Sequence, residues 1–273
     1  MGFFDRFSPD REGPGVEKNA PPKNVFKVFF GVYTRKFYKL LQLNLVHFAC
    51  SIPAIIVAMI ISANFLSSIF NSREYPVNLW LSLSVFIFAF NLVAVGPLQS
   101  GFTYVLRNFS REEHAFVWHD YIQTAKKNFK QSIIMLFINL VVFYSITASF
   151  SWYLGQAEKT LLLNIATGMQ GIFLIIFIMM QIYTYQLMIT FELSIKDIYK
   201  NAFLFSIAMF VPNLLIILLC LALSVFLMMQ VLIGLILLPT FIISVLGLIV
   251  NFYANRIIKK HMIDNPNIDN QNK

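Results

Sequence analysis

The sequence predicts an all-α protein, a polytopic membrane bundle of about six transmembrane helices with an amphipathic interfacial helix on its cytoplasmic side. Only 12% of the 273 residues are charged and 58% are hydrophobic, whereas a soluble domain carries about 25% charged residues. The apolar residues form several long runs, each near the ~20 residues that cross a hydrocarbon layer. Lysines and arginines concentrate in alternate connections between these runs, as in proteins that obey the positive-inside rule.

The first 39 residues are expected to lie outside the bilayer core. Residues 1–24 are polar and proline-rich and lack the apolar core of a signal peptide, which predicts a polar N-terminal tail. In residues 25–39, aromatic side chains recur on one helical face, at Phe26, Phe30, Tyr33 and Phe37, with basic residues between them. Two interpretations stay open: a helix in the headgroup layer, or an extension of the first spanning helix.

The membrane domain is expected over residues 25–255, followed by a polar C-terminal tail at 256–273. Its predicted segments are about residues 40–63, 77–104, 132–153, 165–191, 202–228 and 231–253. Residues expected to kink a helix or to permit close packing are Pro53, Gly96, Pro97, Gly101, Pro212 and Pro239. Few residues separate the last two segments, so two full crossings and a re-entrant pair are both compatible with the sequence.

The distribution of positive charge predicts the orientation. With both termini in the cytoplasm, Arg73 and Lys159 are the only two of the 21 lysines and arginines on the outer side. We therefore expect a multi-pass protein of the cell membrane with cytoplasmic N- and C-termini. The formal net charge of +8 fits basic flanks beside anionic lipid headgroups and does not call for nucleic acid as a partner.

The predicted cytoplasmic loop, residues 105–131, carries the densest set of groups that could contact a partner. Ser110 and Glu113 match a capping box, which predicts a helix start at Arg111. Further along, one helical face is apolar, at Trp118, Tyr121, Ile122, Ala125 and Phe129, and the other is polar, at Asp120, Thr124, Lys127 and Lys130. The candidate contacts for lipid or a partner are Arg107, Arg111, Trp118, Tyr121, Lys126, Lys127, Phe129 and Lys130.

Polar residues inside the predicted spans are neutral amides: Asn91, Asn139, Gln170, Gln181 and Asn213. They could join helices by hydrogen bonds, or they could line a path for a polar solute such as a sugar. No motif of a zinc protease, a phosphate loop or a nucleophile elbow is present, so no catalytic residue, enzymatic activity or cofactor is expected. His114 and His119 are five residues apart, which does not place them on one helical face, and no metal site is expected.

Three stretches resemble the YesL-like family of bacterial membrane proteins, a domain of unknown function. They are GPGVEKNAPPK leading into RKFYKLLQLNLVHFACSIP, then GPLQSGFTYVLRNFSREEHAFVWHDYIQTAKKNFKQS, and more weakly YTYQLMITFELSIKDIYKNAFLFSI. The resemblance implies a membrane protein of a Gram-positive bacterium, from a group often found near ATP-driven carbohydrate importers. Two functional hypotheses follow: an accessory or adaptor subunit that supports carbohydrate uptake by contacting an importer subunit, or a transporter in its own right.

Overall fold

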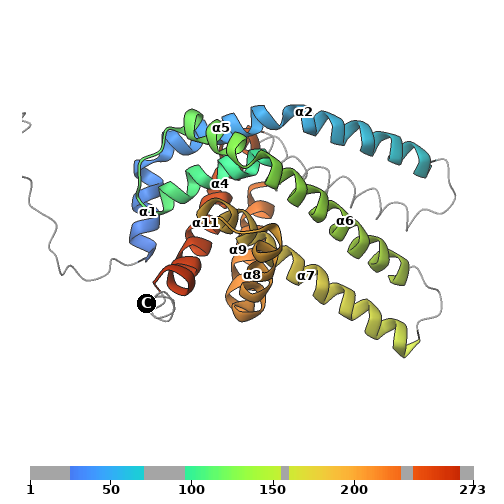
Figure 1. The fold of residues 1–273 in the computed structure, drawn as a ribbon. Coiled ribbons are helices and arrows are strands. Elements are labelled where there is room, and N and C mark those ends of the chain that lie inside the picture. The colour runs from blue at the N-terminus through green and yellow to red at the C-terminus, as the bar shows by residue number, and fades with distance from the viewer. Residues whose placement is uncertain (1–24, 71–95, 155–159, 229–235, 265–273) are drawn as a thin grey trace, which may run out of the picture.

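The computed structural model describes residues 25–70, 96–154, 160–228 and 236–264, and every regular element in these ranges is a helix (Figure 1). The all-α fold class is therefore confirmed for these residues. The elements are α1 (Val25–Arg35), α2 (Phe37–Phe70), α4 (Pro97–Ser110), α5 (Val117–Lys127), α6 (Phe129–Leu154), α7 (Leu161–Thr190), α8 (Ile195–Ala208), α9 (Phe210–Met228), η2 (Leu238–Ile242), α11 (Ile243–Ile258) and η3 (Lys259–Ile263). The predicted N-terminal tail (residues 1–24), residues 265–273 of the predicted C-terminal tail, and Asn91 lie outside these ranges.

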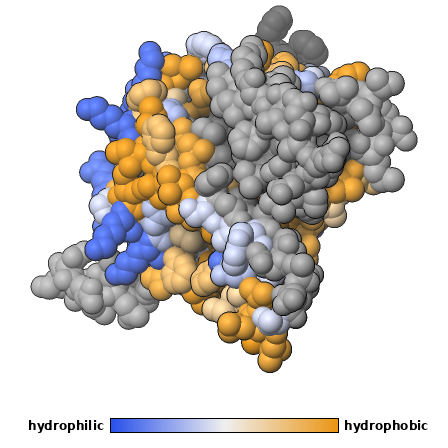
Figure 2. Space-filling model, turned by 90° about the vertical axis from the view of Figure 1, so that its right-hand side faces the viewer, coloured by the Kyte–Doolittle hydropathy of each residue, from blue (hydrophilic) through white to orange (hydrophobic). Residues whose placement is uncertain are grey.

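Some of these helices could span a membrane. In the described part of the chain, α7 and the continuous helical stretch Leu238–Ile263 are long and apolar enough to cross, and α8 with α9 would make a third crossing if the pair is one bent span. Two or three crossings are fewer than the six that the sequence predicts. Figure 2 shows the most hydrophilic residues along one edge of the molecule, beside a broad hydrophobic area.

The predicted fifth segment, 202–228, is divided by a bend. The axes of α8 and α9 differ by 92° across a break at Met209. Pro212 has no backbone N–H to give to the carbonyl four residues earlier, so the helix ladder cannot continue there. The Asn213 side chain bonds back across the bend, because its amide donates to the carbonyls of Phe205 (3.1 Å) and Ser206 (3.4 Å) in α8.

An asparagine side chain also bonds backbone groups at a second break, near Pro239. Pro239 lies in the π-helical turn η2, which opens the regular ladder at the start of α11. The Asn44 amide of α2 donates to the carbonyl of Leu238 (2.9 Å), and its oxygen accepts from the backbone N–H of Ser244 (2.6 Å). At both breaks, a buried asparagine thus bonds backbone groups close to the proline.

The predicted second segment does not continue through Tyr104 as one helix. Gly96 is extended and precedes Pro97, which is the first residue of α4. Proline suits that position because its fixed φ fits a helix start and the missing N–H would be unpaired there anyway. Ten of the fourteen residues of α4 are buried, so α4 lies in the interior of the fold.

Two glycines let other helices approach α4 closely. A Cβ placed on Gly101 would lie 2.2 Å from the carbonyl oxygen of Tyr121 in α5, and one placed on Gly247 of α11 would lie 2.7 Å from side-chain atoms of Phe102 and Leu106. The carbonyl on α5 is backbone, so it cannot move aside without shifting that helix. Gly101 thus permits the contact that places α5 against α4.

The helix start predicted at Arg111 is wrong. Arg111 caps the C-terminus of α4, and the Ser110 hydroxyl donates back to the carbonyl of Arg107. The N–H groups of Glu112 and Glu113 bond the carbonyls of Phe109 (3.0 Å) and Asn108 (2.8 Å), the pattern of a Schellman motif. The Ser-x-x-Glu pattern therefore lies at a helix end, and α5 begins six residues after Arg111, at Val117.

At the N-terminus, α1 is a separate helix. A turn at Lys36 divides it from α2, and Figure 1 shows the two helices running in different directions. Its buried side, Val32 with Val28, Phe29 and Tyr33, packs on the core around α4. Phe26 and Phe30 remain exposed, so the aromatic residues of α1 are divided between core and surface. At the C-terminus, α11 and η3 continue to Ile263, inside the stretch predicted as a polar tail.

Candidate functional site

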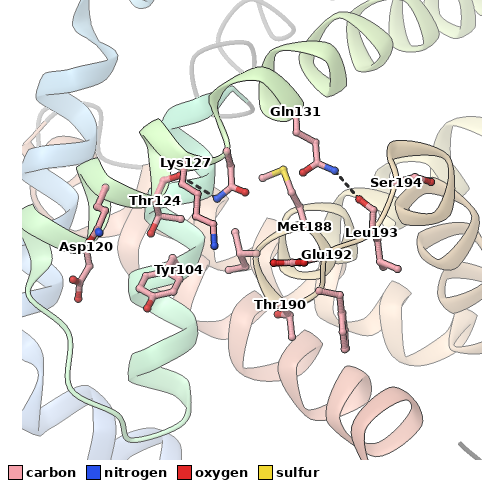
Figure 3. Close-up of a pocket in the computed structure, with 14 residues that line it drawn as sticks. Tyr104, Asp120, Thr124, Lys127, Gln131, Met188, Thr190, Glu192, Leu193 and Ser194 are labelled. Carbon is pink, nitrogen blue, oxygen red and sulfur yellow. Dashed lines mark hydrogen bonds between the residues drawn. The ribbon is translucent and has the colours of Figure 1, made fainter. Parts of the chain in front are cut away.

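The candidate site is a polar groove of about 700 Å³ between α5, the start of α6 and the turn from α7 to α8 (Figure 3). We call it the polar groove. One wall comes from α4 and from the α5–α6 region, and the other from residues 188–194. Its lining is Tyr104, Asp120, Gln123, Thr124, Lys127, Asn128, Gln131, Met188, Ile189, Thr190, Phe191, Glu192, Leu193 and Ser194.

Arg107 holds the two walls together. Its guanidinium projects from α4 and donates through Nη1 to the carbonyl of Ile189 (2.8 Å) and to the Thr190 hydroxyl (3.1 Å). These groups end α7, where backbone carbonyls lack partners and a cation is favoured by the helix dipole. The same guanidinium lies 4.9 Å from the centre of the Tyr104 ring. Burial, followed by the neighbouring Arg111 cation, lowers the pKa of Arg107.

A second contact fixes the groove at the other end. Gln131, in the first turn of α6, donates through Nε2 to the carbonyl of Leu193 (2.9 Å) in the α7–α8 turn. Ser194 then caps α8 by accepting from the N–H of Asp197 (3.2 Å). The two walls of the groove are therefore held together by bonds from α4 and α6 to the end of α7 and the turn that follows it.

Helix α5 presents three faces. Val117, Tyr121, Thr124 and Ala125 are buried, and Tyr121 bonds the buried His47 of α2 (Oη to Nδ1, 3.0 Å). The groove face carries Asp120, Gln123 and Lys127. The outer surface of α5 and the adjoining turn of α6 is aromatic and basic, with exposed side chains at Trp118, Lys126, Phe129 and Lys130. The helix is amphipathic, but Trp118 and Phe129 lie outside its buried face and Thr124 lies within it.

The charges in the groove are of both signs. Figure 3 shows Lys127 on the α5 side and Glu192 at the α7–α8 turn. Both side chains are exposed, and neither is in an ion pair within the described residues. Asp120 is occupied, because its carboxylate accepts from the N–H of Phe116 (2.8 Å) and so caps α5. The groove can thus offer one cation, one carboxylate and several amides and hydroxyls to a ligand.

The predicted contact residues are not all at the surface. Arg107 is 9% exposed and Tyr121 is 0% exposed, so both act inside the protein and neither can be a direct contact for a partner. Arg111 is half-buried and donates through Nε to the Asn255 side chain (3.0 Å). The opposite wall, residues 188–194, was not predicted as part of a site. Its short charged turn is predicted on the same side of the membrane as the 105–131 loop, which is the signal that could have paired them.

The described interior amides bond to the protein. Asn139 and Gln181 exchange hydrogen bonds between α6 and α7 (3.1 and 3.2 Å), and the Tyr199 hydroxyl also donates to Asn139 (2.8 Å). Asn213 accepts from the hydroxyls of Tyr183 (2.6 Å) and Tyr253 (2.7 Å). Gln170 differs, since it lines an apolar groove of about 260 Å³ between α6, α7 and α8.

The groove contains no recognisable catalytic arrangement of a nucleophile with an oriented base. In the part of the chain that the structure describes, no group of three His, Cys, Asp or Glu side chains could hold a metal ion. Comparisons with protein-family models, with curated proteins and with solved structures found no match for this chain.

Proposed function

We propose that this chain is an accessory or adaptor subunit of the cell membrane that supports uptake of a solute, specifically a carbohydrate, by docking a cytoplasmic segment of an ATP-driven importer in the polar groove. The observation that carries the proposal is the groove itself, whose two walls are bonded together and whose lining includes Lys127 and Glu192. Trp118 is exposed on the outer surface of the same helix, α5. Such a surface suits a polypeptide segment with charges of both signs and an aromatic anchor. The importer as partner, and membership of the YesL-like family, rest on the resemblance of the sequence.

The proposal includes six crossings with both termini in the cytoplasm. At 1.5 Å per residue, α2 with 34 residues is about 50 Å long and α6 with 26 residues is about 40 Å long. Both exceed the ~30 Å hydrocarbon layer. Together with α7, α9 and α11, and with the second predicted segment (about residues 77–104), most of which lies outside the described residues, they would make six. Lys126, Lys127 and Lys130 would then face the cytoplasm and its anionic headgroups.

Photocrosslinking tests the proposal with a matched control. Trp118 and Trp152 are the same residue type and are each 58% exposed, but Trp152 lies at the far end of α6. A photoreactive amino acid at position 118 is expected to crosslink an importer subunit or its ATPase, whereas the same probe at 152 is not. Recovery of lipid alone from position 118 would count against an adaptor.

Charge reversal identifies the groove as the dock. Lys127→Glu and Glu192→Lys are expected to reduce the position-118 crosslink at least tenfold, because each places a repulsive charge against the bound segment. Lys27→Glu makes the same change on α1, away from the groove, and should leave the crosslink intact. Equal loss in all three variants would show that the contact depends on overall charge and not on the groove.

No specific observation favours the alternative function, a transporter in its own right. Asn139, Gln181 and Asn213 bond to neighbouring side chains and line neither the polar groove nor the apolar groove at Gln170. The cavity at Gln170 is otherwise lined by apolar residues.

A further inference from the structure

Another cavity lies between the end of α4, the end of α11 and α1. It measures about 490 Å³, and we call it the basic pocket. Three of its lining side chains are cations, namely Arg111, Arg256 and Lys259, against one carboxylate, Glu113. Like charges gathered in one cavity repel one another. An anion that enters the pocket reduces this repulsion, so its binding is electrostatically favourable.

The geometry of the three cations suits a multivalent oxygen ligand. Arg256 and Lys259 are three residues apart and therefore lie on one face of the helix. The guanidinium of Arg111 is oriented by its Nε bond to the Asn255 side chain (3.0 Å), which directs its remaining N–H groups without occupying them. None of the three cations is in an ion pair within the described residues. Arginine binds phosphate through paired N–H donors.

The basic pocket also has an apolar border and lies at the end of a candidate span. Val28 and Phe252 contribute to its wall, and the candidate span Leu238–Ile263 ends beside it. The end of a span is where lipid phosphates lie, and basic residues there attract anionic headgroups. The pocket thus combines phosphate-binding side chains with an apolar border.

We propose that the basic pocket binds a phosphate group, supplied by an anionic phospholipid headgroup or by a free phosphorylated solute. The proposal is independent of the polar groove, because the two cavities share no lining residue. The competing explanation is that the three cations only stabilise the C-terminal ends of α4 and α11 through the helix dipole. In that case removing them would lower thermal stability without changing ligand binding.

The experiment uses the full chain in detergent micelles, in two arms. In the first, the protein is mixed with equal amounts of phosphatidylglycerol and phosphatidylcholine, and native mass spectrometry measures which lipid it retains. In the second, the unfolding temperature is measured in sodium phosphate against sodium chloride at equal ionic strength. A preference for phosphatidylglycerol identifies a headgroup, and stabilisation by phosphate without that preference identifies a soluble ligand. Absence of both effects would overturn the proposal.

Four variants assign the effect to the pocket. Arg256→Gln and Lys259→Gln remove exposed cations, so they should fold normally, and each is expected to weaken binding about fivefold. Glu113→Gln removes the carboxylate and should strengthen binding by a similar factor. Lys200→Gln removes an exposed cation of α8 outside the pocket and should change binding less than twofold. An equal loss in Lys200→Gln and Arg256→Gln would show attraction to overall charge and refute the site.

Discussion

At the scale of single residues, buried polar side chains join helices that are far apart in the sequence. Arg107 bonds the end of α7, His47 bonds Tyr121, and Asn139 bonds Gln181. Each bond adds only a small net stability when both partners are present. Loss of one partner leaves the other buried without a bond, which lowers the free energy of unfolding by about 1–3 kcal/mol. These residues therefore determine how the helices are placed, and their replacement should be detectable as lost stability.

Arg107→Leu is expected to lower the free energy of unfolding by about 2 kcal/mol, because the Ile189 carbonyl and the Thr190 hydroxyl lose their donor. Thermal unfolding in detergent micelles measures the effect. Lys126→Gln, at an exposed position on α5, should stay within about 0.5 kcal/mol of the wild type. If Arg107→Leu unfolds like Lys126→Gln, the guanidinium does not hold the groove walls together.

Gly101→Ala tests the contact between α4 and α5. The added Cβ would meet the backbone of α5, so we expect a loss of about 2–3 kcal/mol through strain. The control is Gly168→Ala in α7, where no atom lies within 4 Å of the added Cβ. That change should be neutral or stabilise the helix by up to about 1 kcal/mol. Similar unfolding temperatures for the two variants would contradict the close approach.

At the scale of elements, the helices break at defined points, and asparagine side chains bond backbone groups beside two of these breaks. Asn213 bonds the end of α8 at the bend, and Asn44 bonds the backbone around η2. At the end of α4 the left-handed position of the Schellman motif is occupied by Glu112, with φ of 61°, where glycine is usual. Glu112 pairs with Arg35 of α1, which explains why a side chain is present at this position.

Glu112→Gly and Glu112→Ala separate backbone strain from the ion pair. Both variants lose the contact with Arg35, but only glycine relieves the left-handed strain. Glu112→Gly is therefore expected to be more stable than Glu112→Ala by about 1 kcal/mol, as measured by thermal unfolding. Equal stabilities would mean that this turn does not keep its left-handed conformation.

Asn44→Ala and Asn213→Ala should each cost about 2 kcal/mol, because each leaves at least two buried backbone or hydroxyl groups without a partner. Asn164→Ala, at an exposed site in the first turns of α7, provides the control and should be nearly neutral. The comparison is made by thermal unfolding in the same detergent. A neutral Asn213→Ala would show that the α8–α9 bend does not depend on this side chain.

At the scale of the whole molecule, two cores share α11. One core surrounds α4 and takes Leu248 from α11, and the other surrounds α7 and α8 and takes Ala254 and Ile258. Exposed apolar side chains cover α7 and α9, including Ile172, Phe173, Leu218 and Phe226. A surface of this kind is stable when lipid solvates it, which supports the membrane assignment.

The predicted orientation is tested by labelling. In a chain whose Cys50 and Cys220 are replaced by serine, Lys127→Cys is expected to react with a membrane-impermeant maleimide only in inside-out vesicles. Lys159→Cys is expected to react in intact cells, because the positive-inside rule places it on the outer side. Labelling of position 127 from outside intact cells would overturn the topology.

The helical class and the membrane candidates were predictable from the sequence, because long apolar runs and low charge content are local properties of the chain. The orientation of α5 was only partly predictable, since its periodicity placed Thr124 among the polar residues and Trp118 on the buried face. The burial of Arg107 was not predictable, nor was the placement of α5 across the polar groove from residues 188–194, which lie about 60 to 80 positions further along. Such contacts depend on how the helices pack around α4, and packing between distant elements leaves no periodic signal in one sequence.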